Sequence, residues 1–209
     1  MDSQRQCLST TLTTLALIFI VLMRSTAQAQ ARSETGSRQV SIAQDPKSVE
    51  DWFKNLPNAK ERTTKLHFYF HDIVTAKNPT VVTVAESNLT KTSPTSFGLV
   101  RVMDDPLRVG PQPESKLVGR AQGIYVAAGL EEVALLLTLN YVFTDGPYNG
   151  STLSVLGHNP ILHTYREIPI LGGSGVFRLA RGIATAKTVW FDLKTQNAVV
   201  EYNLIVLHY

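Results

Sequence analysis

From Lys65 to the C-terminus the sequence repeatedly alternates hydrophobic and polar residues, and this period of two restricts the chain to β-structure. Successive side chains of an extended strand point to opposite faces. One face of the segment 65–74 would carry Leu66, Phe68, Phe70, Asp72 and Val74, and the other His67, Tyr69, His71 and Ile73. No amphipathic helix of crossover length interrupts the pattern, so the sheet is expected to be antiparallel.

Seven further segments show the same alternation. They span residues 80–86, 97–103, 117–127, 133–143, 151–157, 176–191 and 198–208. Clusters of Gly, Pro, Asn and Asp that are typical of turns separate them, such as Asp104-Asp105-Pro106. About eight long antiparallel strands predict an all-β domain closed into an eight-stranded barrel, whose interior holds side chains or one small ligand. The alternative is a two-sheet sandwich, which would leave more strand edges to protect.

The N-terminus has the layout of a secretory signal peptide. An apolar run from Leu12 to Met23 precedes a stretch of small residues, and it is too short to span a bilayer. We therefore predict cleavage near Ala29, which removes residues 1–29 and sends the protein to the extracellular space; a buried N-terminal helix is the alternative. Cleavage would also remove Cys7, the only cysteine, so the mature chain would have no disulfide and no thiolate.

Residues 30–61 are polar and turn-rich apart from one helical segment. Asp45 can cap a helix that has Pro46 in its first turn. Hydrophobic residues then recur on one helical face, at Val49, Trp52, Phe53 and Leu56. We predict a short helix that packs onto the domain, with a partner-binding helix as the alternative. The barrel domain would then occupy residues 62–209.

The length and net charge of the chain limit the kinds of function that it can have. About 180 residues remain after the predicted cleavage, which is enough for one domain with a sizeable core. The formal net charge of +3 is scattered along the chain and forms no basic stripe, so nucleic-acid binding is not indicated. Two N-glycosylation acceptor sequences, at Asn88 and Asn149, fit an extracellular protein.

Asp72 is the most informative polar residue, because it shares the more apolar face of its strand. Burial of a carboxyl among Leu66, Phe68 and Phe70 would raise its pKa, which suits a proton donor or acceptor near neutrality. The alternative is that Asp72 lies at the end of the strand and caps a turn.

Tyr125 lies on a face of the segment 117–127 that otherwise holds only small side chains. That face carries Gly119, Ala121, Gly123, Tyr125 and Ala127. If it points inward, it is a wall where the phenol could hydrogen-bond a ligand; if outward, the glycines mark bends or close packing. Some close approach is expected either way.

Other kinds of site are not indicated. His67 and His71 are four residues apart on a strand, so their backbones lie about 13 Å apart. One zinc ion, whose ligands lie about 2 Å from the metal, cannot easily take both. The Gly172–Gly175 segment lacks the full nucleophile-elbow and dinucleotide-binding patterns and is predicted to be a turn. No metal site and no cofactor site are therefore predicted.

Four segments of the chain resemble plant dirigent proteins. They are KLHFYFHDIV (65–74), LVGRAQGIY (117–125), YNGSTLSVLG (148–157) and REIPILGGSGVFRLARG (166–182). The similarity runs in the same order from about Leu66 to Tyr209. It implies an eight-stranded antiparallel barrel related to allene oxide cyclase, which is usually trimeric and lies in the cell-wall space.

The resemblance also implies a function. Dirigent proteins guide the coupling of two phenoxy radicals, made from monolignols by a separate laccase or peroxidase, toward one stereoisomer. Matched segment by segment, Asp72 would be the acid that protonates a quinone methide, Tyr125 a phenol-binding group and Arg166 an arginine of the ligand site. Thr188 would line the same cavity.

One position departs from the lignan-forming members of the family. These carry a second acid in the loop after the STLSVLG-like strand, where this chain has Asn159. The next carboxylate, Glu167, follows Arg166 and could merely pair with it. Relatives with asparagine here include legume enzymes that remove water from an isoflavanol to close a pterocarpan ring.

Three functions are therefore carried forward. The first is a guide for radical coupling in phenylpropanoid or lignan biosynthesis, with oxidation left to a separate enzyme. The second is a pterocarpan-synthase-like dehydratase that acts through a quinone methide, and the third is a non-catalytic cell-wall binding protein. Asp72→Asn is expected to keep the fold but abolish selectivity or turnover.

Overall fold

The computed structural model describes residues 44–209 of the chain. The predicted signal peptide at residues 1–29, its cleavage site and Cys7 lie outside the described residues. Within residues 44–209, no helix is both long and apolar enough to cross a membrane.

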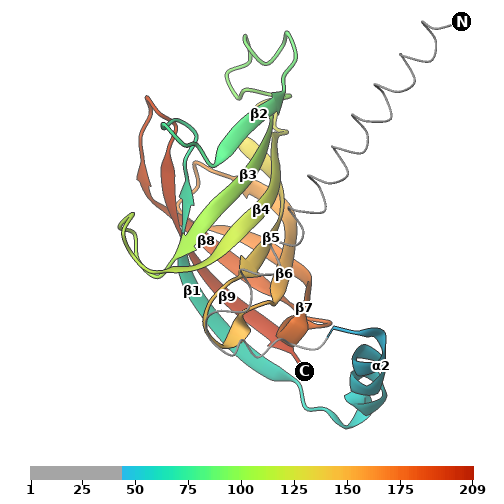
Figure 1. Cartoon of the computed structure of the whole chain (residues 1–209). Helices are drawn as coiled ribbons and strands as arrows, with labels where there is room; N and C mark the ends of the chain where they lie inside the picture. The colour runs from blue at the N-terminus through green and yellow to red at the C-terminus, as the bar shows by residue number, and fades with distance from the viewer. Residues whose placement is uncertain (1–43) are drawn as a thin grey trace, which may run out of the picture. The chain divides into compact units, whose positions relative to one another are not determined.

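The described fold is built almost entirely from antiparallel strands (Figure 1). In chain order these are β1 (Arg62–Asp72), β2 (Val81–Ala85), β3 (Val100–Arg108), β4 (Leu117–Ala127), β5 (Ala134–Phe143), β6 (Thr152–Pro160), β7 (Arg166–Ser174), β8 (Arg181–Phe191) and β9 (Ala198–His208). The helix α2 (Pro46–Asn55) and the short 3-10 helix η1 (Leu56–Asn58) precede them. Two more 3-10 helices, η2 (Gly146–Tyr148) and η3 (Gly175–Phe177), lie in the loops before β6 and β8.

Eight of the strands close into a barrel. Pairing runs from β1 through β9, β8, β7, β6, β5 and β4 to β3, and the circle closes where Tyr69 and Phe70 of β1 pair with Arg108 and Leu107 of β3. β2 is an additional strand on the free part of β3. The predicted eight-stranded antiparallel barrel is therefore confirmed. Closure pairs the strand edges that the alternative sandwich would leave open.

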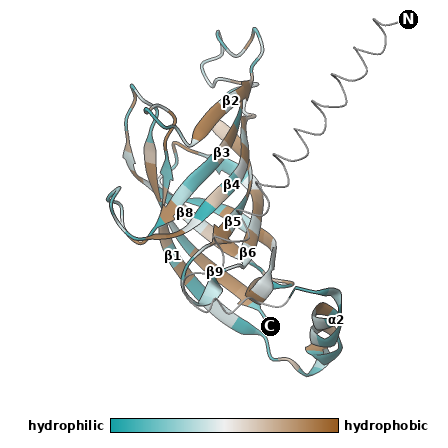
Figure 2. Ribbon diagram, viewed as in Figure 1, coloured by the Kyte–Doolittle hydropathy of each residue, from teal (hydrophilic) through white to brown (hydrophobic). Residues whose placement is uncertain are grey.

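The hydrophobic face of each strand fills the barrel interior. Figure 2 shows hydrophobic and hydrophilic residues alternating along the strands. The centre is aromatic: the ring centroid of Tyr141 lies 5.0 Å from that of Phe68 and 5.7 Å from that of Tyr202. Edge-to-face pairs at such distances add to the free energy gained by burying the rings.

The predicted strands differ from the observed ones around β7. This strand is not among the predicted ones, because the sequence predicts a turn over residues 172–175. In the structure Gly172, Gly173 and Ser174 end β7, and only Gly175, with φ of 66°, begins the turn through η3. The predicted strand at 176–191 consequently begins only at Arg181.

The acidic cluster Asp104-Asp105-Pro106, predicted to separate strands, lies inside β3. Its proline is tolerated because β3 changes partner there, from β2 at Met103 to β1 at Leu107. A missing backbone N–H costs little at such a change of partner. Asp105 is thereby turned toward the interior.

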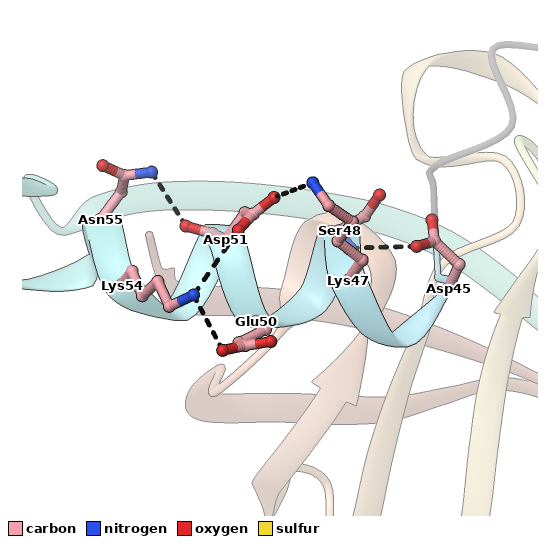
Figure 3. A network of polar contacts seen from close by, with 7 residues as sticks. All are labelled: Asp45, Lys47, Ser48, Glu50, Asp51, Lys54 and Asn55. Atoms are coloured by element: carbon pink, nitrogen blue, oxygen red, sulfur yellow. Dashed lines mark hydrogen bonds and ion pairs between the residues drawn. The ribbon is translucent and has the colours of Figure 1, made fainter.

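The predicted helix before the barrel is present as α2. Oδ1 of Asp45 accepts a hydrogen bond of 3.0 Å from the Ser48 amide, as expected of an N-cap. Exposed ion pairs of Lys47 and Lys54 with acidic residues follow along the helix (Figure 3). The packing is looser than predicted, since no residue of α2 is buried and Phe53 is 60% exposed. The guanidinium of Arg178, in the loop between β7 and β8, lies over the Trp52 ring of α2, 5.5 Å from the ring centroid. This contact links the helix to the end of the barrel.

The small side chains on the interior face of β4 allow β5 to approach closely. A Cβ added at Gly123 would overlap the carbonyl oxygen of Thr138 and the backbone of Leu139. Gly119 meets the backbone of Val142 in the same way. These glycines therefore permit strand-to-strand contact and do not leave open space beside Tyr125.

We expect Gly123→Ala to destabilise the barrel by about 1–3 kcal/mol, because the methyl group can be accommodated only by moving a paired strand. Gly172→Ala is the matched control, since a Cβ there meets no atom within 4 Å. The control should leave stability unchanged or raise it slightly, because alanine restricts the unfolded chain. Chemical denaturation of both variants measures the difference, and equal midpoints would show that β4 and β5 can separate freely.

Candidate functional site

The barrel topology brings the five predicted site residues to one end of the interior. Antiparallel strands place the C-terminal ends of β1, β4, β6 and β8 beside the N-terminal ends of β3, β5, β7 and β9. Asp72, Tyr125, Asn159, Arg166 and Thr188 all lie at or near those ends, on the inward face of their strands. We call this group the interior site.

Asp72 is half-buried, and the Oδ1 atom of its carboxyl is buried without a hydrogen-bond partner. Burial raises its pKa to about 7, and the positive charge of Arg101 partly offsets this rise. The turn after β1 is capped by a different residue, since Oδ1 of Asn197 accepts hydrogen bonds from the amides of Val74 and Thr75. The Asp72 carboxyl is thus available near neutrality as a proton donor.

Arg166 is buried at the start of β7. Its Nη1 atom donates 2.7 Å to the Thr188 hydroxyl and 3.2 Å to the carbonyl of Ile161, while Nε has no partner. Burial lowers the pKa of Arg166, but a guanidinium keeps its charge under ordinary conditions. A buried cation with an unused donor can bind a negatively charged or carbonyl-type oxygen of a ligand.

Tyr125 is held by a residue that the sequence did not single out. Nη1 of Arg101 donates 3.3 Å to the Tyr125 hydroxyl, and Nη2 donates 2.7 Å to Oε1 of Gln196 in the β8–β9 turn. Arg101 therefore links β3 and β4 to that turn. Burial raises the pKa of Tyr125, so its phenol stays protonated.

Asn159 lies in β6 and not in the loop after it, where sequence comparison had placed it. It pairs with Leu135 of β5, is buried, and has an Oδ1 atom without a partner. Glu167 is exposed on the opposite face of β7 from Arg166. The interior site therefore has an amide and no carboxyl at this position, and Glu167 does not supply one.

Asp105 is a second buried carboxyl that sequence reasoning missed. It is fully buried, its Oδ1 atom accepts a hydrogen bond from the Thr80 hydroxyl, and its Oδ2 atom has no partner. Burial, together with the charge of Asp72, raises the pKa of Asp105 to about 8. The alternation of β3, in which Met103, Asp105 and Leu107 share one buried face, was the available signal.

His67 and His71 do not form a common site, whereas His158 and His163 both pair with Glu132. Nε2 of His67 lies 2.8 Å from Glu201 on the outer wall, and Nε2 of His71 lies 3.3 Å from the Gly110 carbonyl. Among residues 44–209, no three His, Cys, Asp or Glu side chains are arranged to hold a metal ion.

The chain is similar to known proteins over nearly its whole barrel. The family model described as Dirigent-like protein matches residues 63–207. Dirigent protein 23 of Arabidopsis thaliana is 48% identical over 161 residues, which cover 77% of this chain and 86% of that protein. Pterocarpan synthase 1 of Glycyrrhiza echinata is 50% identical over 151 residues, which cover 72% of this chain and 80% of that protein. The solved structure of the pterocarpan synthase dirigent protein GePTS1, also 50% identical, matches with a TM-score of 0.69 over 72% of this chain and 92% of its own. A match of this extent, on a barrel with the same strand arrangement, shows that the chain belongs to the dirigent family.

Proposed function

We propose that the interior site binds a phenolic quinone methide and that Asp72 exchanges a proton with it. The observation that carries this proposal is the half-buried Asp72 carboxyl, whose Oδ1 atom is buried without a partner and whose pKa is raised to about 7. A carboxyl in that state can act as an acid and then, once ionised, as a base. Arg166 would bind the quinone-methide oxygen, on which negative charge accumulates.

The reaction we favour is loss of water from an isoflavanol-type benzylic alcohol. Asp72 gives its proton to the benzylic hydroxyl, whose C–O bond breaks to release water. The para phenol gives its proton to water, and a proton returns from solvent to the Asp72 carboxylate, which leaves a neutral quinone methide. A second hydroxyl of the substrate then adds to the benzylic carbon, and its proton passes to the ring oxygen. The sum is the loss of one water, and it needs only one acid in contact with the substrate.

Asn159 is the reason for preferring this reaction. A dehydration needs only one acid. The resemblance to dirigent proteins implies a second acid at this position in lignan-forming members. The buried amide of Asn159 cannot act as that acid. Two of the most similar relatives, from Glycyrrhiza echinata and Glycine max, are named pterocarpan synthases.

The second candidate is a guide for stereoselective coupling of phenoxy radicals, with the oxidant supplied by a laccase or peroxidase. It is favoured by relatives of equal similarity that are named dirigent proteins, such as Dirigent protein 21 of Arabidopsis thaliana at 50% identity. The same apolar interior with one acid and one cation would orient a radical pair and its quinone-methide product.

One pair of incubations separates the two candidates. The protein is first incubated with a chiral isoflavanol and no oxidase, and pterocarpan is measured by chiral chromatography. It is then incubated with coniferyl alcohol and laccase, and the enantiomers of the dimers are separated against a laccase-only control. Pterocarpan in the first incubation supports the dehydratase, and an enantiomeric excess only in the second supports the coupling guide. Products matching the controls in both would leave the non-catalytic binding protein as the remaining reading.

The proposed acid predicts a particular pH dependence. The donor form of Asp72 is the protonated one, and its pKa is about 7. Turnover should therefore be constant below about pH 6 and fall about tenfold per pH unit well above pH 7. A turnover that rises with pH through this range would show that the carboxylate, as a base, is the form required.

We further propose that the protein is secreted, glycosylated and self-associating. Asn88 is exposed in the loop after β2, whereas Asn149, after η2, is half-buried. Apolar side chains of Ile124, Leu156 and Leu171 are exposed around a hollow on the outer wall of the barrel, which copies of the chain could cover. Mass spectrometry of protein recovered from the apoplast tests cleavage and glycans. Light scattering tests for a trimer, and Leu156→Glu should convert it to a monomer if this face is the interface.

A further inference from the structure

Asp105 is a fully buried carboxyl to which the proposed reaction gives no role. The preceding residue, Asp104, is exposed on the outer face of β3, and its Oδ1 atom lies 2.5 Å from Nε of Arg120. Asp105 has 0% exposure and receives the Thr80 hydroxyl at one oxygen only. Burying a carboxyl oxygen without a hydrogen-bond partner costs free energy, so such an oxygen needs a physical explanation.

The register between β1 and β3 indicates that Asp105 lies near Asp72, and the charge of Asp72 acts on Asp105. β1 and β3 pair at Tyr69 with Arg108 and at Phe70 with Leu107. Continuing the same register by two residues along each strand sets Asp72 opposite Asp105, with both side chains on the inward face. Oδ1 of Asp72 and Oδ2 of Asp105 are each without a partner.

Backbone bonds fix this juxtaposition. The Thr80 amide donates 2.9 Å to the carbonyl of Ile73, which directly follows Asp72. The Asp104 amide donates 2.9 Å to the carbonyl of Thr80. The end of β1, the start of β2 and the middle of β3 are thereby tied together around the two carboxyls, so Asp105 cannot move independently of Asp72.

Burial is the main cause of the raised pKa of both carboxyls, and the surrounding charges modify it. The pKa of Asp105, about 8, lies above that of Asp72, about 7, and the charge of Asp72 contributes to the difference. Arg101 favours ionisation of Asp72, and Arg120 favours ionisation of Asp105. The other titratable groups that interact electrostatically with both carboxyls are Tyr125 and Tyr202. Both stay neutral near pH 7, because burial raises their pKa values.

We propose that Asp105 is a positioning residue for Asp72: as a neutral acid it donates a hydrogen bond to the Asp72 carboxylate that forms when Asp72 gives up its proton. This role rests on the proposed function of Asp72 as proton donor. The proton of Asp105 stays with Asp105, and the proton that Asp72 loses returns from solvent, so no reactant other than water is needed. The interaction stabilises the carboxylate only after proton transfer, which is when the reaction requires it.

Titration of the Asp72 side-chain carboxyl carbon by NMR tests the pairing without any substrate. In the wild-type protein we expect a main step near pH 7 and a second, smaller step near pH 8, when Asp105 ionises. Asp105→Asn keeps a donor but cannot ionise, so the main step should stay in place and the second should vanish. Asp105→Leu removes the donor, so the main step should rise by about one pH unit or more. Asp104→Asn and Asp104→Leu are the controls and should leave both steps unchanged.

The outcomes separate this inference from the proposed function. A fall of the main step in Asp105→Asn would show that Asp105 acts as a charge and would overturn the proposal. A wild-type curve with no second step would overturn it also, and this result is obtained even if Asp105→Leu fails to fold. If turnover exists, Asp105→Asn should retain it within about threefold and Asp105→Leu should lose at least about tenfold. If no substrate is turned over, the titration still decides whether the two carboxyls are paired.

Discussion

Asp72→Asn is expected to reduce turnover by a factor of about 10²–10⁴, the usual loss when a positioned acid is removed, or to abolish the enantiomeric excess of a coupling product. The substitution keeps the shape of the side chain and deletes only its ability to give up a proton. Because Oδ1 of Asp72 is buried without a hydrogen-bond partner, replacing the carboxyl by an amide breaks no bond at that atom and should not destabilise the barrel. A chiral product assay and a denaturation curve, recorded on the same preparation, measure the two effects separately.

Glu167→Gln is the matched control for Asp72→Asn. Glu167 is a carboxylate on the outer face of β7, beside a residue of the interior site but exposed. Its replacement removes one negative charge without changing the interior and should leave turnover within about twofold. Equal losses from both substitutions would show that overall charge, and not an interior acid, governs the reaction.

The second large effect is expected from Arg166→Met, which should lower turnover by a factor of about 10²–10³, the loss typical of removing a donor that stabilises a developing negative charge. Methionine fills much of the volume but cannot bind an oxygen or reach the Thr188 hydroxyl, which accepts from Arg166 at 2.7 Å. Arg166→Lys should give an intermediate loss, because an ammonium keeps the charge but not the planar set of donors.

The control for Arg166→Met is Arg181→Met. Arg181 begins β8, at the end of the barrel opposite to the interior site. Its Nη2 atom forms an exposed ion pair of 2.8 Å with Glu61. Exposed ion pairs contribute little to stability, so this variant should match the wild-type protein in both assays. If Arg166→Met raises KM alone and leaves kcat unchanged, then Arg166 binds substrate and transition state equally and does not act on the chemical step.

Local sequence patterns predicted the parts of the fold that depend on side-chain alternation. The N-cap at Asp45 and the strands with strict alternation, such as β1 and β4, follow from residues that are neighbours in the chain. β7 was missed because Pro169 and two glycines disrupt its pattern, and it becomes a strand by pairing with β6 and β8. The acidic cluster inside β3 was misread for the same reason: it is accommodated by a change of partner that lies outside the local sequence.

The sequence by itself determined that the chain forms a β-barrel with Asp72 on an apolar face, because alternation and burial are properties of one strand at a time. The motifs shared with dirigent proteins also identified Tyr125, Asn159, Arg166 and Thr188. Only the tertiary structure decided that these residues meet at one end of the interior, since their proximity depends on strand pairings between distant segments. It also decided that Arg101 and Asp105 interact electrostatically with Asp72, because they lie on β3, a strand distant in sequence that pairs with β1.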